Sequence, residues 1–178
     1  MHTKQKIEQL LASAGASPNK RRGQNFLIDL NLMGLLIKAA RLNETDLVLE
    51  IGSGTGSLTE ELAARAGRVI TVEIDTLLAD ITASQTSEFS NVSVINDDIL
   101  QSKNTISKQV IELLAAEKPS HSRFMLVGNL PYSVASPAMI NLITGPVTVD
   151  EIYATIQKEV AERMTAEPGS DHYGVLSI

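Results

Sequence analysis

The segment that decides the fold is Leu47-Val48-Leu49-Glu50-Ile51-Gly52-Ser53-Gly54-Thr55-Gly56. A short, mostly apolar run is followed by glycine at every second position, which is typical of a buried strand that turns tightly. The spacing differs from the P-loop, which needs Gly-Lys and then Ser or Thr, and from the dinucleotide fingerprint, which has two residues before its last glycine. We therefore predict a strand and a tight turn toward a ligand, with pyrophosphate binding less favoured. A turn without any ligand is the alternative.

Apolar runs and helical repeats alternate along the rest of the chain. Further strands are predicted at 69–74, 92–95, 124–128 and 152–156. Apolar residues three and four apart predict helices at 7–14, 32–39, 58–66, 77–81, 106–114 and 158–166. Gly15, Gly67 and Pro119 are expected to end three of them, and Ser136-Pro137 to begin another with an N-cap and a proline.

Strands that alternate with helices predict the α/β class. We expect a doubly wound, mostly parallel, Rossmann-like sheet with right-handed crossovers. Ligands of such sheets bind at the carboxyl ends of the strands, near the point where the strand order reverses. The residues that directly follow each strand are therefore the candidates for function.

Composition narrows the class of protein. The chain has 178 residues, enough for one domain, with 43% hydrophobic and 20% charged residues, as in globular proteins. It has no cysteine and only three separated histidines, so no disulfide and no metal site are expected. It lacks both an apolar stretch of about 18 residues and the apolar core of a signal peptide, so we expect a cytoplasmic protein without membrane association.

Charge is distributed unevenly. The net charge is −6, yet residues 1–41 hold seven basic and two acidic side chains. A basic arm on an acidic body indicates a polyanionic partner, and Lys20, Arg21 and Arg22 are the candidates for its phosphates. A solvated helix face is the alternative.

Acidic residues lie at the carboxyl end of the second predicted strand and directly after the third. Glu73 lies 21 residues after Gly52, a spacing at which a carboxylate commonly accepts hydrogen bonds from ribose hydroxyls. Asp97 and Asp98 follow the third strand, and either carboxylate could accept a hydrogen bond from the exocyclic amine of an adenine. A nucleoside-containing cofactor is therefore expected. The alternatives are a surface glutamate and an Asx turn.

Asn129-Leu130-Pro131-Tyr132 follows the fourth predicted strand. The lone pair of an exocyclic amine is delocalised into its ring, and two acceptors around the amine favour a pyramidal nitrogen that can attack. The Asn129 side-chain carbonyl and the Leu130 backbone carbonyl are candidates, because Pro131 restricts Leu130 to extended geometry. Tyr132 offers a flat face for base stacking. A proline turn with a half-buried tyrosine is the alternative.

Together these motifs resemble the class I S-adenosylmethionine-dependent methyltransferases, and within them the rRNA adenine N6,N6-dimethyltransferases of KsgA type. The resemblance runs from about Lys20 to the end of the chain and includes the stretches 20–29, 50–59, 72–75, 129–132, 157–163, 168–170 and 173–177. It implies a cofactor site formed by Asn25, Leu27, Gly52, Gly54, Glu73, Asp98 and Asn129. It implies catalysis by Asn129, Leu130, Pro131 and Tyr132.

The implied cofactor is S-adenosylmethionine, and the implied substrate is two adjacent adenosines in a hairpin loop of small-subunit rRNA. Each adenosine would be methylated twice on N6 during ribosome biogenesis, by a monomer. We expect residues 1–178 to form the cofactor-binding domain, with 1–28 as its basic helix and loop. The family continues beyond this point, so we expect an N-terminal part that lacks the last strands and a C-terminal helical domain.

Three alternatives stay open. The erythromycin-resistance methylases modify large-subunit rRNA with similar motifs, although Leu130 and Ser136-Pro137 favour the KsgA type. A ribosome-assembly factor could keep the fold without transferring methyl groups. A nicotinamide oxidoreductase is disfavoured by the glycine spacing and by the lack of a proton relay.

Overall fold

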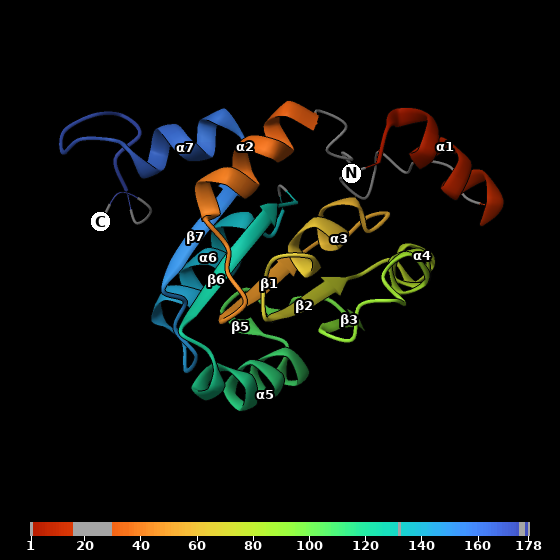
Figure 1. Ribbon diagram of the computed structural model, residues 1–178. Helices are drawn as coiled ribbons and strands as arrows, with labels where there is room; N and C mark the ends of the chain where they lie inside the picture. Colours follow the sequence, from red (N-terminus) through yellow and green to blue (C-terminus); the bar gives the residue numbers. More distant parts are fainter. Residues whose placement is uncertain (1, 16–29, 132, 175–176, 178) are drawn as a thin grey trace.

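A computed structural model describes residues 2–15, 30–131, 133–174 and 177 of the protein. Its centre is a five-stranded sheet in the order β3-β2-β1-β6-β7, with every neighbouring pair parallel (Figure 1). The strands are β1 (Asp46–Ile51), β2 (Arg68–Glu73), β3 (Val92–Asn96), β6 (Arg123–Asn129) and β7 (Glu151–Thr155). The predicted α/β class and parallel sheet are confirmed.

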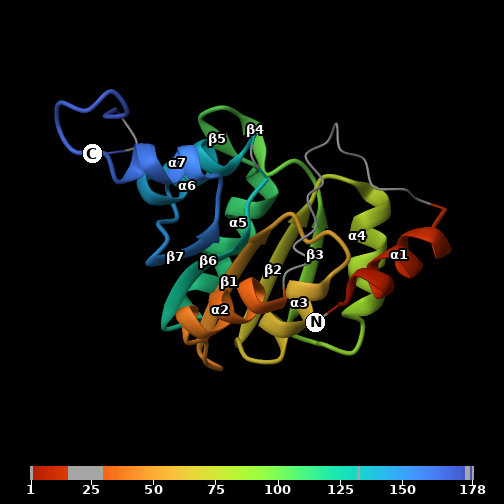
Figure 2. The same cartoon turned by 90° about the horizontal axis from the view of Figure 1, so that it is seen from above.

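The central strand is apolar on both faces because helices cover both faces of the sheet. All six residues of β1 are buried. Leu47, Leu49 and Ile51 pack with the helices α5 (Lys108–Glu117) and α6 (Ala135–Thr144). Val48 faces the other way and packs with residues of α2 (Leu30–Ala40) and α3 (Ser57–Ala63). Figure 2 shows these two helices on the same face of the sheet.

The first helix lies against the outside of the fourth. The described part of the chain opens with α1 (Lys4–Ser13), in which Ile7 and Leu11 pack against Leu78 and Ile81 of α4 (Thr76–Gln85). Both views place α1 beside α4 at one end of the molecule (Figures 1 and 2). Gly15 follows the helix with φ +69°, as predicted for a helix stop. The last helix, α7 (Lys158–Met164), follows β7.

Strand order reverses between β1 and β6. The chain proceeds from β1 outward through β2 and β3, and then returns to place β6 on the other side of β1. Helices on both sides of this reversal diverge, which leaves a crevice at the carboxyl ends of the strands. Residues 52–56, which follow β1, and 130–131, which follow β6, therefore face the same crevice.

The predicted helix at 106–114 is wrong at its start. Residues 100–106 form a hairpin of β4 (Leu100–Ser102) and β5 (Thr105–Ile106), and α5 begins only at Lys108. Ile106 is buried across from Leu100 rather than on a helix. Residues 100–106 are mostly polar, and strands of three and two residues are too short to show an alternating pattern, which explains the error. Pro119 does follow the helix, within a 3₁₀ turn at Lys118–Ser120.

Two predicted helix ends are also wrong. Helix α3 ends at Ala63, and Gly67 does not have the positive φ of a helix-capping glycine. A Cβ at Gly67 would lie 2.2 Å from the Glu44 carbonyl oxygen. The close approach of the Glu44 backbone therefore explains this glycine. Helix α6 begins at Ala135, so Ser136 and Pro137 lie inside its first turn instead of capping it. Proline is tolerated there because the first-turn N–H groups have no intrahelical partner.

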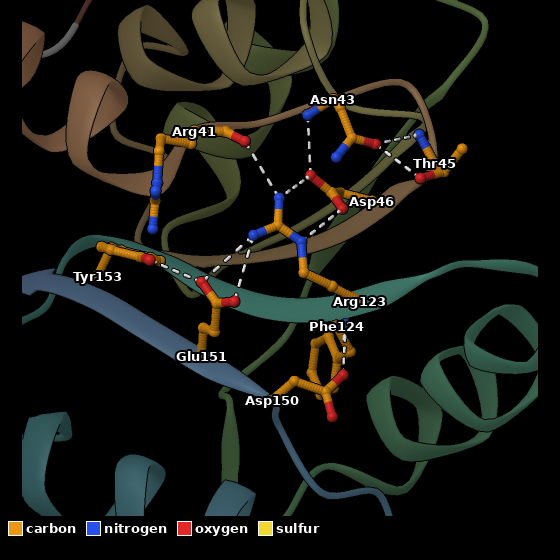
Figure 3. A network of polar contacts seen from close by, with 9 residues as sticks. All are labelled: Arg41, Asn43, Thr45, Asp46, Arg123, Phe124, Asp150, Glu151 and Tyr153. Carbon is orange, nitrogen blue, oxygen red and sulfur yellow. Dashed lines mark hydrogen bonds and ion pairs between the residues drawn. The ribbon is translucent and has the colours of Figure 1, made fainter.

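An ionic network ties the amino ends of three strands together (Figure 3). Arg123 Nη2 and Nε lie 2.7 and 3.0 Å from the two carboxylate oxygens of Asp46, whose side chain is fully buried. Arg123 Nη1 lies 3.2 Å from Glu151 Oε1. Since Asp46 starts β1, Arg123 starts β6 and Glu151 starts β7, one guanidinium joins all three strands.

We expect Arg123→Met to lower the free energy of unfolding by about 3 kcal/mol, because it leaves the Asp46 carboxylate buried without its partner. Chemical denaturation measures the loss. Adding Asp46→Asn should recover part of it, and Glu151→Gln alone, at the more exposed pair, should cost at most about 1 kcal/mol. Equal losses for Arg123→Met and Glu151→Gln would contradict this account.

Candidate functional site

A cavity of about 510 Å³ opens at the carboxyl ends of β1, β2 and β6. It lies at the reversal of strand order, where the sequence places its candidate residues. The predicted site residues that line it are Gly52, Gly54, Glu73, Asp98, Asn129, Leu130 and Pro131. The structure thus brings together residues from four loops that are up to 79 positions apart in the chain.

The glycine turn is shaped by its backbone angles. Gly52, Gly54 and Gly56 have φ values of +83°, +60° and +82°, which only glycine adopts readily. A Cβ at Gly52 would lie 3.1 Å from Cγ of Pro131. The first glycine is therefore needed both for the turn and for close packing against the loop that follows β6.

Glu73 joins the glycine turn to the start of α4. Its two carboxylate oxygens accept hydrogen bonds from the backbone N–H groups of Gly54 and Asp75, both at 3.0 Å. Burial raises the pKa of Glu73 above its usual value, and these backbone hydrogen bonds oppose the shift. A carboxylate held at this position can accept hydrogen bonds from a ligand's hydroxyl groups.

Asp98 both forms a turn and borders the cavity. Its Oδ1 accepts a hydrogen bond from the Leu100 N–H at 2.9 Å, which is the Asx turn considered as the alternative. The residue is nevertheless exposed at the cavity wall. The Asx turn and the predicted ligand-binding role are compatible, because the turn holds the Asp98 carboxylate beside the cavity.

The loop after β6 is anchored from both sides. Leu130 is only 1% exposed, and its N–H donates to the Thr155 carbonyl oxygen at 3.2 Å. The Pro131 carbonyl accepts from the N–H groups of Val134 and Ala135, at 3.1 and 3.0 Å, where α6 begins. Asn129 ends β6 and lines the cavity.

Several predicted site residues lie outside the described residues. Asn25 and Leu27 of the cofactor set, the basic residues Lys20, Arg21 and Arg22, and Tyr132 of the catalytic set belong to this group. Their roles stay predictions. Within the described ranges, no group of three metal-ligating side chains was found and no helix is long and apolar enough to cross a membrane.

Sequence reasoning missed Glu50, which lines the cavity floor and is 1% exposed. Its Oε2 accepts a hydrogen bond from Thr59 Oγ1 at 2.6 Å. Burial raises the pKa of Glu50 to about 7, despite this hydrogen bond. The signal was available: a carboxylate inside an apolar strand run is rare without a purpose.

We expect Glu50→Gln to change how stability depends on pH. Between about pH 4.5 and 7 the folded protein holds the Glu50 proton more tightly than the unfolded chain. The contribution of Glu50 to the free energy of unfolding therefore falls as pH rises through this window, by about 3 kcal/mol. Relative to wild type, Glu50→Gln should become more stable by that amount between pH 4.5 and 8.

Urea denaturation across this pH range measures the difference. Glu112→Gln is the control, because that side chain is 66% exposed and should follow the wild type at every pH. A constant offset between Glu50→Gln and wild type would show that Glu50 does not titrate in this window.

Comparison with known proteins is consistent with this geometry. The family model described as ribosomal RNA adenine dimethylase matches residues 15–178. The ribosomal RNA small subunit methyltransferase A of Ligilactobacillus salivarius is 40% identical over 171 residues, which is 95% of this chain and 55% of that protein. The protein of the same name from Anoxybacillus flavithermus is 39% identical over 99% of this chain and 58% of its own length.

Solved structures give the same picture. A dimethyladenosine transferase from Plasmodium falciparum superposes with a TM-score of 0.66 at 29% identity, covering 84% of this chain and 50% of that one. The 23S rRNA methyltransferase ErmE gives 0.61 at 29% identity, covering 82% and 53%. The chain spans about half the length of the curated relatives it matches. Because the family model covers nearly all of it, the chain belongs to the ribosomal RNA adenine dimethylase family.

Proposed function

We propose that the protein takes part in S-adenosylmethionine-dependent N6,N6-dimethylation of two adjacent adenosines in small-subunit rRNA, as a step of ribosome biogenesis. The observation that carries the proposal is that Gly52, Glu73 and Asn129 line one cavity at the reversal of strand order. The names of the curated relatives, ribosomal RNA small subunit methyltransferase A, support the choice of the small subunit.

The residues of the cavity fit this cofactor. Gly52 and Gly54, both with positive φ, turn the chain tightly and line the cavity with backbone, beside which the methionine part would lie. Glu73 would accept hydrogen bonds from the ribose hydroxyls, and Asp98 from the adenine amine. Asn25 and Leu27, which lie outside the described residues, are assigned to the same cofactor by the family motif. When bound, the sulfonium supplies the methyl group and the driving force for its transfer.

The loop after β6 prepares the substrate. Asn129 Oδ1 and the Leu130 carbonyl accept the two N6 hydrogens of an adenine that has left its stack, which makes the nitrogen lone pair available for direct displacement. Tyr132 stacks on the base. The N6–methyl bond would form as the methyl–sulfur bond breaks, with S-adenosylhomocysteine as the leaving group, and the cationic nitrogen would then lose one proton to water. Because that proton is acidic, no strong general base is needed, and positioning supplies most of the rate enhancement. Lys20, Arg21 and Arg22 contact phosphates, which position the RNA without reading its sequence.

The proposed function assigns residues 1–178 to one cofactor-binding domain, with 1–28 as a basic arm.

Large-subunit rRNA is the second candidate substrate, because ErmE matches the fold nearly as well as the dimethyladenosine transferase. Incubation with separate small and large subunits and with methyl-labelled cofactor distinguishes the two. RNA binding without transfer of label would favour the assembly-factor alternative instead.

We expect S-adenosylmethionine to stabilise the protein and NAD to leave its stability unchanged. At one hundred times its dissociation constant, a ligand that binds only the folded state raises the free energy of unfolding by about 2.7 kcal/mol. Thermal unfolding with each cofactor measures this effect, and Glu73→Ala should reduce it. Stabilisation by NAD alone would contradict the assigned cofactor.

We expect Asn129→Ala to lower turnover on the order of 100-fold, the usual cost of removing one polar group that acts at the reacting atoms. Affinity for S-adenosylhomocysteine should change much less. Transfer of labelled methyl to small subunits and calorimetric titration measure the two effects. Asn141→Ala is the matched control, because its amide donates to the Pro137 carbonyl within α6, away from the cavity. Full turnover of Asn129→Ala would rule out a role of this amide in holding N6.

A further inference from the structure

The end of β7 contacts both acceptors assigned to the adenine amine. Asn129 and Thr155 are the last register partners of β6 and β7. The Thr155 hydroxyl donates a hydrogen bond of 2.6 Å to Asn129 Oδ1, and the Thr155 carbonyl accepts the Leu130 N–H at 3.2 Å. One residue thus holds the side chain of Asn129 and the backbone that carries the Leu130 carbonyl.

The contact to Asn129 has a definite chemical consequence. The terminal torsion of an asparagine side chain is broad, so an amide without a fixed partner samples many orientations. A carbonyl oxygen has two lone pairs, and Thr155 occupies one at Asn129 Oδ1. The proposed reaction uses the other lone pair for a substrate N–H, and the hydrogen bond from Thr155 restricts the amide plane. Both groups are part-buried, which reduces competition from water.

We propose that Thr155 is a positioning residue, which orients the Asn129 amide so that Oδ1 accepts the adenine N6 hydrogen. This inference rests on the proposed methyl transfer. Thr155 itself does not line the cavity, so it acts through Asn129. Its side chain belongs to β7, which is paired with β6 in the described sheet.

The test compares Thr155→Val, Thr155→Ser and Thr144→Val. Valine keeps the shape and the strand propensity of threonine but lacks the hydroxyl, and serine keeps the hydroxyl. Thr144 is the control, because its hydroxyl donates to the Ile140 carbonyl within α6. With small ribosomal subunits that lack the methylations, we expect Thr155→Val to lower kcat about 3- to 10-fold, the usual effect of one hydrogen bond.

The KM for S-adenosylmethionine should stay within about twofold, Thr155→Ser should restore most of kcat, and Thr144→Val should match the wild type. In an Asn129→Ala background, Thr155→Val should cost nothing further, since its effect passes through the missing amide. Equal losses in the valine and serine variants, or a full additional loss in the double variant, would overturn the inference.

A second measurement separates this inference from the proposed function. The ¹H–¹⁵N signals of the Asn129 side-chain amide, recorded without substrate, should shift in Thr155→Val and stay near their wild-type positions in Thr155→Ser and Thr144→Val. Unchanged signals in Thr155→Val would refute the orientation of the amide. A wild-type protein that transfers no methyl would refute the proposed function, and the amide signals would still decide whether Thr155 orients Asn129.

Discussion

The site depends on the close approach of two loops, one after β1 and one after β6. Gly52 and Pro131 come so near that a single added Cβ would lie 3.1 Å from the proline ring. Strand order reverses between these two strands, so no crossover helix separates the loops. The glycine turn forms one wall of the cavity, and Asn129 and Leu130 form another. A side chain at position 52 would push these walls apart and separate the residues assigned to cofactor and substrate.

Two buried carboxyl groups dominate the electrostatics of the cavity. Two carboxyl groups, Glu50 and Glu73, are both buried there, and burial raises the pKa of each. The negative charge of Glu73 further raises the pKa of Glu50. A positive charge near the two carboxyl groups would favour their ionised forms and lower both pKa values. The proposed cofactor carries both an ammonium and a sulfonium, so its binding would favour the ionised form of both groups.

Features that depend on a local sequence pattern could be predicted from the sequence. Features that depend on contacts between residues distant in the chain could not. The five strands of the sheet follow from their apolar runs, and the site residues Gly52, Glu73 and Asn129 follow from their places after strands. The hairpin at 100–106 was missed because its strands of three and two residues are too short to show a period. Gly67 was wrongly predicted to end a helix, because the contact that requires a glycine there comes from the backbone of Glu44, 23 positions earlier in the chain. Thr155 carries no motif; only register places it against Asn129.

The two ends of the sheet are linked through that register. Arg123 holds Asp46 and Glu151 where β1, β6 and β7 begin, and Asn129 and Thr155 meet where β6 and β7 end. A strand that slips by one residue turns every side chain to the opposite face. Paired parallel strands advance by the same distance per residue. The ionic network at the amino ends of β6 and β7 therefore constrains which residue of β7 lies beside Asn129 at their carboxyl ends. The apolar residues between the two ends of these strands require the same alignment, because a slip by one residue would turn buried side chains toward the wrong layer of helices. Packing and charge therefore specify one alignment, and the geometry of the proposed reaction is set by interactions that lie a strand's length away from it.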